Sequence, residues 1–199
     1  EKIDEVNEKH ACKGNRIYYL ALPPQVYESA VGTISKIKNA GSWSRIVFEK
    51  PFGTDLKSAI QLNKQVTKFF GEDEIYRIDH YLGKDIVQNI MVFRFANSIF
   101  EEIWNSKFID HIQITIAETV GIEERAGYYE STGAIRDIIQ NHGLQILSLI
   151  AMEPPNSTKA ADIWDEKVKV LRALESVRDL VIGQYGPGEI DGKKVDVGM

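Results

Sequence analysis

The stretch Arg16-Ile-Tyr-Tyr-Leu-Ala-Leu22, closed by Pro23-Pro24, decides the fold class. A short, continuous apolar run that ends at a proline turn is typical of a strand buried on both faces of a sheet. Two further runs of the same kind follow, at Ser44–Phe48 and Glu74–Asp79. Helical patterns at 25–39 and 54–70 separate the three runs, and Thr54-Asp55 supplies an N-cap for the second helix.

Strands separated by helices of this length predict parallel βαβ units. Ligands of such sheets bind beyond the carboxyl ends of the strands. The three predicted strands run into ALPP, EKPFG and DHYLGK, which are polar or proline-rich ends. The pattern alone therefore indicates a binding site at this edge.

The character of the chain changes after Gly83. Residues 84–94 read as a helix, and Phe108–Ala117 alternates apolar and polar residues, which predicts a strand of an antiparallel sheet. Long helices are expected at 130–152 and 165–180, and the Gly- and Asp-rich tail 183–199 reads as loop. We therefore predict a parallel α/β part in residues 1–79 and an α+β part with an antiparallel sheet in residues 80–199.

Composition excludes several classes of protein. Hydrophobic residues make up 43% and charged residues 27%, which is ordinary for a globular chain, and the net charge of -5 argues against a nucleic-acid partner. The single cysteine, Cys12, fits a reducing cytoplasm, and no apolar run approaches the ~20 residues of a membrane span. We expect no metal site, because the four histidines are scattered. The chain opens without Met inside a charged helical pattern, so we expect a piece of a longer protein.

The segment Arg77-Ile-Asp-His-Tyr-Leu-Gly-Lys84 places His80, Tyr81 and Lys84 at a strand-to-helix turn. Positive charge, several donors and a helix N-terminus are what a phosphate needs. A solvated lysine and a capping Asp79 explain the same spacing about equally well.

His142 shares a helical stripe with Ile135, Ile138, Ile139 and Ile146. A hydrogen-bonded core histidine is the commoner explanation of such a stripe, and a general base at the wall of a cleft is the alternative. A base needs an orienting carboxylate, which Asp79 at its strand end is placed to supply. Asp137 precedes His142 by five positions, so α-helical geometry points it roughly 140° away.

Two further residues stand at strand ends. Lys50 precedes Pro51, and a cis X-Pro bond there would fix the direction of the lysine, although a surface lysine before a turn is more common. Glu118 ends the alternating run, where it either accepts hydrogen bonds from sugar hydroxyls or is solvated.

Seven segments in order resemble the glucose-6-phosphate dehydrogenase family along nearly the whole chain. They are YLALPPQVYE (19–28), EKPFG (49–53), RIDHYLGK (77–84), FANSIFEEIWN (95–105), AETVG (117–121), GYYES with GAIRDIIQNH (127–142) and DEKVKVL (165–171).

The resemblance implies a role for each candidate residue. His142 matches the general base that takes the proton of the sugar C1 hydroxyl, and Asp79 matches the carboxylate that orients it. The remaining matches are phosphate-binding residues, a lysine between substrate and cofactor, carboxylates for sugar hydroxyls and coenzyme contacts. His80, Tyr81 and Lys84 match the phosphate-binding residues, and Glu118 and Asp137 match the carboxylates that hold sugar hydroxyls. Lys50 matches the lysine between substrate and cofactor. Tyr27, Lys50 and Pro51 match coenzyme contacts, and the Pro51 peptide bond is expected to be cis.

The family's reaction is oxidation of D-glucose 6-phosphate to 6-phospho-D-glucono-1,5-lactone with NADP, the first step of the pentose phosphate pathway. The G-x-G-x-x-G turn of the coenzyme domain is absent here, so the Rossmann-like sheet is incomplete and NAD remains an alternative. The resemblance implies a homodimer or homotetramer for the intact protein. It also implies a weakly active or inactive 199-residue chain, which lacks the pyrophosphate turn and most of the antiparallel sheet.

Two rivals remain from the residues. A non-catalytic sugar-phosphate-binding module would need the phosphate residues but no oriented base. Another sugar dehydrogenase with a related two-domain plan would leave His80, Tyr81 and Lys84 without a purpose.

Overall fold

The structure, a computed structural model, describes residues 2–38, 41–119, 121–122, 126–190 and 193–195. The chain divides into two compact units, Glu1–Asp79 and His80–Met199. The described residues contain no helix with the length and apolar character needed to cross a lipid bilayer.

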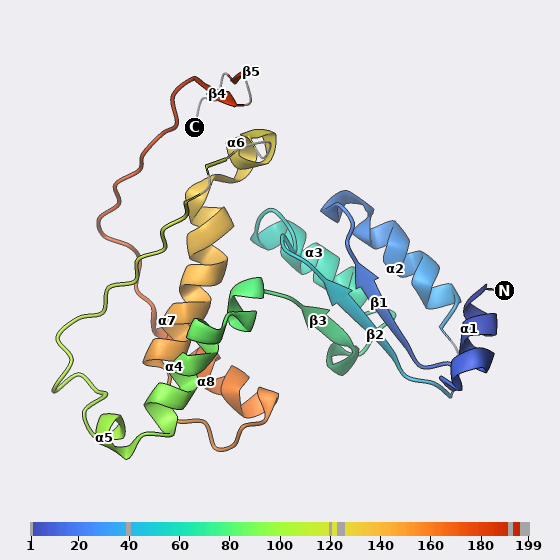
Figure 1. Cartoon of the computed structure of the whole chain (residues 1–199), viewed down its shortest axis with the longest axis horizontal. Helices are drawn as coiled ribbons and strands as arrows, with labels where there is room; N and C mark the ends of the chain where they lie inside the picture. The colour runs from blue at the N-terminus through green and yellow to red at the C-terminus, as the bar shows by residue number, and fades with distance from the viewer. Residues whose placement is uncertain (1, 39–40, 120, 123–125, 191–192, 196–199) are drawn as a thin grey trace. The chain divides into compact units, whose positions relative to one another are not determined.

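The first unit is built on a three-stranded parallel sheet in the order β1-β2-β3 (Figure 1). Its elements are α1 (Lys2–His10), β1 (Arg16–Leu20), η1 (Pro24–Val26), α2 (Tyr27–Lys36), β2 (Ser44–Phe48), α3 (Leu56–Val66), η2 (Glu72–Glu74) and β3 (Ile75–Arg77). Leu20 pairs with Phe48, and Phe48 pairs with Arg77, so the three carboxyl ends lie at one edge. The predicted parallel α/β arrangement is confirmed.

The sheet of this unit is buried on one face only. Ile46 and Phe48 are fully buried and pack with residues of α2 and α3. Ile17 and Tyr19 point to the other face and are 60% and 54% exposed. The prediction that these strands are buried on both faces is therefore wrong for the described unit, because α2 and α3 both contribute their apolar residues to the same core.

A capping box fixes the start of α3. The Asp55 side chain accepts a hydrogen bond from the Ser58 backbone N–H at 2.7 Å, and the Asp55 backbone N–H donates to Ser58 Oγ at 3.0 Å. The predicted N-cap is confirmed. This cap satisfies N-terminal backbone donors that the helix itself cannot pair.

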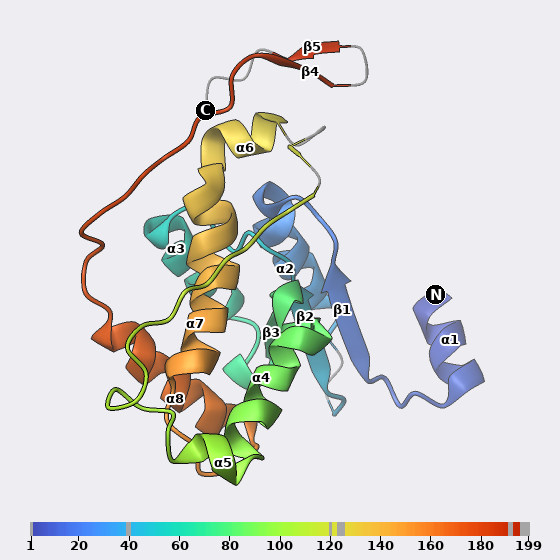
Figure 2. The same cartoon turned by 60° about the vertical axis from the view of Figure 1, so that its left-hand side comes forward.

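The second unit consists mainly of helices, with a short two-stranded antiparallel sheet. Its elements are η3 (His80–Gly83), α4 (Asp85–Phe95), α5 (Ser98–Glu101), α6 (Ala126–Ala134), η5 (Ile135–Gly143), α7 (Leu144–Ala151), α8 (Ala160–Ala173), β4 (Gly188–Ile190) and β5 (Lys193–Val195). In Figure 2, α6, η5 and α7 follow one another along one column. Gly133 departs from helical geometry within α6, with φ 68° and ψ 171°.

Buried apolar residues and one buried arginine hold α4 against α7 and the turn after it. Val87 of α4 clusters with Leu149 and Met152. Arg94, 5% exposed, donates through Nη1 to the Leu149 carbonyl at 2.7 Å and through Nη2 to the Met152 carbonyl at 2.8 Å. These bonds satisfy carbonyls at the C-terminal end of α7, where the helix has no partner of its own.

The antiparallel sheet lies elsewhere than predicted. Residues 108–117 form no strand, because a strand needs a neighbouring ladder and no described segment pairs with them. The antiparallel pair is instead β4 with β5, in the tail that was predicted to be loop. The helix predicted at 165–180 begins earlier and ends at Ala173, as α8.

Candidate functional site

In the first unit, the residues that follow β2 are held by two tyrosines. The Tyr19 hydroxyl donates to the Glu49 carboxylate, and the Tyr27 hydroxyl donates to the Glu49 carbonyl at 3.3 Å. Burial, with the Glu49 charge as the second cause, raises the pKa of Tyr27. The Lys50–Pro51 bond that follows is cis, as predicted. The two hydroxyls therefore fix the backbone immediately before Lys50.

Asp79 closes the first unit directly after β3. The Ile78 backbone N–H donates to the Phe48 carbonyl at 2.9 Å, which extends the pairing of β3 with β2 by one residue. Asp79 is thus placed by a paired strand end, as the pattern predicted, and its role toward His142 stays a prediction.

The phosphate candidates of the second unit lie on one tight turn. His80 and Tyr81 belong to η3, and Lys84 is the residue before α4, with φ -74° and ψ 131°. The Lys84 carbonyl accepts the first hydrogen bonds of α4, from Val87 at 2.9 Å and Gln88 at 3.1 Å. The three side chains therefore precede a helix N-terminus, where backbone N–H groups favour an anion.

The helix that carries the predicted base is not a regular α-helix there. Residues Ile135–Gly143 are π-helical, and both Asp137 and His142 are buried, at 2% and 1% exposed. A π-helix joins residues five apart through its backbone hydrogen bond. Asp137 therefore lies about one turn from His142, nearer to the same side than the α-helical expectation of roughly 140°. That expectation is wrong because it assumed the commoner helix type.

Two other rings of the second unit contact the His142 imidazole. Tyr81 stacks on the imidazole, with ring centroids 3.9 Å apart and planes 13° apart. His80 meets the same imidazole edge to face, with centroids 4.7 Å apart. Lys84 Nζ lies 3.7 Å from the Tyr81 ring centroid. The structure thus brings the predicted base together with all three predicted phosphate residues.

Glu118 completes this cluster by accepting a hydrogen bond from the Tyr81 hydroxyl at 2.6 Å. That hydrogen bond, followed by the charges of Lys84, His142 and His80, lowers the pKa of the exposed Glu118 carboxyl. The cluster therefore combines an anionic acceptor, two imidazoles and an ammonium. Such a set can bind a polyhydroxylated anion and move a proton.

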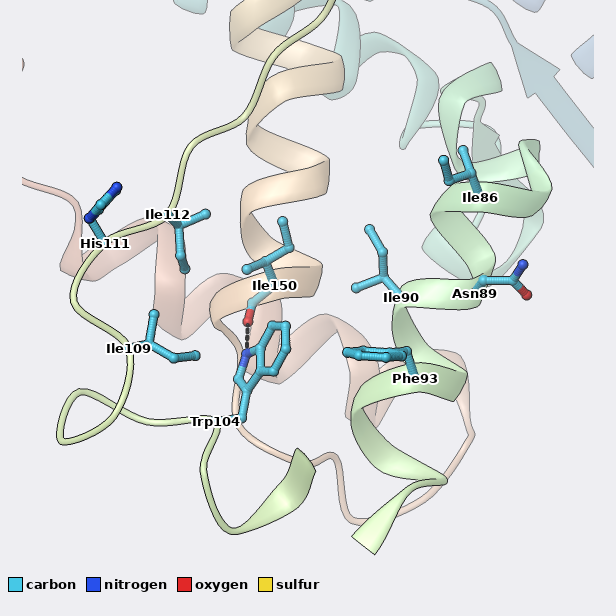
Figure 3. A pocket seen from close by; sticks show the side chains of 9 residues that line it. All are labelled: Ile86, Asn89, Ile90, Phe93, Trp104, Ile109, His111, Ile112 and Ile150. Carbon is cyan, nitrogen blue, oxygen red and sulfur yellow. Dashed lines mark hydrogen bonds between the residues drawn. The ribbon is translucent and has the colours of Figure 1, made fainter. Parts of the chain in front are cut away.

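An apolar hollow of about 510 Å³ lies elsewhere in this unit, between α4, α7 and the loop 109–112 (Figure 3). Trp104 in its wall donates through Nε1 to the Ile150 carbonyl at 2.8 Å. Its lining is largely isoleucine and aromatic, and His111 at its rim pairs with Asp110 at 2.9 Å. That pair is exposed to solvent, and the rest of the described lining is apolar apart from Asn89, so we take the His142 cluster as the candidate site.

Two features, one in each unit, were not foreseen from sequence. Glu49 was not proposed as a site residue, although it stands directly before Lys50 in EKPFG. The stack of Tyr81 on His142 was also missed, because the two residues are far apart in the chain and no local pattern signals their contact.

Two family models match the chain almost end to end. Residues 1–89 match "Glucose-6-phosphate dehydrogenase, NAD binding domain", and residues 91–197 match "Glucose-6-phosphate dehydrogenase, C-terminal domain".

Curated relatives agree with these models. The glucose-6-phosphate 1-dehydrogenase of Bacillus subtilis is 49% identical over 97% of this chain, which covers 41% of that protein. The enzyme of the same name from Caenorhabditis elegans is 51% identical over 86% of this chain and 34% of its own. This chain thus spans about two fifths of the length of the curated relatives it matches.

Solved structures give the same result. A glucose-6-phosphate dehydrogenase in complex with its substrate glucose-6-phosphate matches with a TM-score of 0.85 at 39% identity, over 98% of this chain and 42% of that one. The glucose-6-phosphate 1-dehydrogenase from Mycobacterium avium matches with a TM-score of 0.78 at 41% identity, over 88% and 39%. The chain belongs to the glucose-6-phosphate dehydrogenase family.

Proposed function

We propose that the protein containing this chain oxidises D-glucose 6-phosphate to 6-phospho-D-glucono-1,5-lactone with NADP, the first step of the pentose phosphate pathway. NAD is the alternative acceptor. The observation that carries the proposal is the cluster around His142, in which a buried imidazole contacts Tyr81 and His80, beside Lys84 and Glu118. The relatives that bear this enzyme name support the same reaction.

The residues after β2 fit one end of a nicotinamide dinucleotide. The aligned carboxyl ends of parallel strands are where such coenzymes bind, and Lys50 follows one of them behind a fixed Glu49. We assign Lys50, Tyr27 and Pro51 to coenzyme contact. The nicotinamide ring, when bound, accepts the hydride that leaves the sugar C1. Residues 1–79 are then the later part of the coenzyme domain, and residues 80–199 are the start of the substrate and dimerisation domain.

His142 is proposed as the general base. It is buried, so the positive charge that forms when it takes the C1 hydroxyl proton needs a nearby anion to stabilise it. We assign Asp79 to orienting the ring and to stabilising the positive charge that develops on it, in the way that a buried carboxylate does in a serine-protease triad.

The remaining residues are assigned to the substrate. His80, Tyr81 and Lys84 bind the phosphate at the start of α4, and Lys50 lies between sugar and coenzyme. Glu118 accepts sugar hydroxyls. Its lowered pKa keeps the carboxyl charged, and a charged carboxylate is the stronger acceptor. Asp137 is assigned to the same task.

Two other functions remain to be tested. A sugar-phosphate-binding module without catalysis would keep Lys84 and Glu118 but has no need of a buried imidazole. A dehydrogenase of unphosphorylated sugars would not need the cations at the start of α4. We propose that the intact protein works in the cytoplasm as a homodimer or homotetramer, with glucose 6-phosphate as its partner and without nucleic acid or membrane.

The proposed function is tested by His142→Asn in the intact natural chain. We expect kcat to fall by roughly 10² or more while KM changes little, because a general base acts mainly in the transition state. Lys57→Glu, at an exposed position of α3, is a matched control for handling and folding. Near-normal turnover of the His142 variant would remove this residue from catalysis. If the unmodified protein binds glucose 6-phosphate but does not oxidise it, the binding module is favoured.

A further inference from the structure

The tyrosine ring against His142 is buried and closely aligned. Tyr81 and His142 are 6% and 1% exposed, and their planes differ by only 13° at a centroid distance of 3.9 Å. At that separation the two rings are in van der Waals contact, so the imidazole cannot tilt toward Tyr81.

Tyr81 is itself held from two directions. Its hydroxyl donates to Glu118 Oε1 at 2.6 Å, which fixes the ring along its long axis. Lys84 Nζ lies 3.7 Å from the ring centroid. An ammonium and an imidazole this close cannot share one face of the ring, so the tyrosine lies between them.

His80 restricts the imidazole further. Its ring meets His142 at 75° with centroids 4.7 Å apart, and it meets Tyr81 at 69° with centroids 5.1 Å apart. The three rings thus contact one another pairwise. Rotation of the His142 ring toward either of the other two rings is therefore blocked.

We infer that Tyr81 is a positioning residue for His142, because its fixed aromatic ring packs against the imidazole and holds it in one orientation. The inference rests on the proposed function and adds a role for the ring to the role assigned to the Tyr81 hydroxyl. A base held in one direction has less freedom to lose at the moment of proton transfer, so the ring acts on kcat. The hydroxyl acts on substrate affinity.

The kinetic test compares Tyr81→Leu with Tyr81→Phe in the intact natural chain, with glucose 6-phosphate and NADP. Leucine removes the aromatic ring, and we expect kcat to fall about 10²-fold, the usual loss for a displaced catalytic group. Phenylalanine keeps the aromatic ring but loses the hydroxyl, with its hydrogen bond to Glu118 and its proposed phosphate contact. We therefore expect kcat to be at least tenfold above that of the leucine variant while KM stays raised. Tyr76→Leu, an exposed tyrosine of the first unit, is the matched control. Equal losses of kcat in both variants, or no loss in Tyr81→Leu, would overturn the inference.

A magnetic resonance measurement tests the stack without any activity. In protein labelled at histidine, the ring protons of His142 lie above the tyrosine and should resonate upfield of ordinary histidines. The signal is assigned by its absence in His142→Asn. We expect the upfield shift to persist in Tyr81→Phe and to vanish in Tyr81→Leu. An ordinary shift in the unmodified protein disproves the stack whether or not the enzyme turns over, whereas an upfield shift without turnover sinks only the proposed function.

Discussion

The two units bury different kinds of side chain. The core of the first unit is a cluster of apolar residues from the sheet, α2 and α3, and Ser44 is its one buried polar residue among those described. The second unit buries Arg94, Asp137, His142, Ser148 and Glu166. Burying polar groups costs free energy unless they are paired. Of these, Asp137 and His142 belong to the candidate site, and Arg94 holds α4 against α7. The comparison therefore sets the apolar scaffold core of the first unit against a second unit that also buries polar side chains of the candidate site.

The scaffold side of this comparison is tested by Phe48→Ala. Phe48 is fully buried and meets Tyr27 and Phe52 edge to face, with centroids 5.2 and 5.3 Å apart. We expect the free energy of unfolding to fall by about 3–5 kcal/mol, from lost burial and the cavity left behind. Denaturant unfolding measures it. Ile17→Ala, on the exposed face of the same sheet, should cost well under half as much, and equal costs would break the distinction between the faces.

The site side is tested by Lys84→Glu. We expect affinity for glucose 6-phosphate to fall by about 10²-fold, because a charge-assisted contact is lost and a repulsion replaces it. The fold should survive, since an acidic residue is favourable at the start of a helix. Calorimetry with glucose 6-phosphate measures the affinity, with Lys57→Glu as the control. Unchanged affinity would show that the phosphate assignment is wrong.

A smaller effect is expected at the cap of α3. Asp55→Ala should lower the free energy of unfolding by about 1 kcal/mol, because the Ser58 backbone N–H loses its acceptor. Gln61→Ala, exposed on the same helix, should change it by less than about 0.5 kcal/mol. If both variants lose the same amount, the cap contributes nothing specific.

The smallest expected change is in the pKa of the Glu118 carboxyl. Its lowered pKa means that the bond to Tyr81 contributes at pH values above the ordinary glutamate range and is lost as pH falls through the lowered pKa. Tyr81→Phe removes the first cause of that shift, so the pKa of Glu118 should rise toward its ordinary value. A carboxyl titration followed by magnetic resonance measures it, and an unchanged titration would contradict the hydrogen bond from Tyr81 to Glu118.

Sequence reasoning succeeded where the pattern is local. The apolar runs at 16–22 and 44–48 and the cap at Asp55 specify strands and a helix start by themselves. It failed where a partner decides the outcome. Residues 108–117 alternate like a strand, yet no described segment pairs with them. The exposed face of Ile17 and Tyr19 likewise depends on what packs against it and not on the run itself.

The site follows the same rule. His142 and the turn that carries Tyr81 were identified from their own residues and from the family resemblance. Their stacking was not foreseen, because it depends on a π-helical segment that propensity does not signal and on a contact between distant segments. The direction of Asp137 relative to His142 differs from the α-helical expectation for the same reason.

The most direct test of the central claim is the absorbance of reduced nicotinamide, followed with glucose 6-phosphate and NADP. It is measured on the intact natural chain and on this 199-residue chain in parallel, with folding verified for both. The proposed function predicts turnover by the intact chain, and weak turnover or none by the shorter chain. Absence of turnover by the folded intact chain, with NADP and with NAD, would contradict the dehydrogenase assignment.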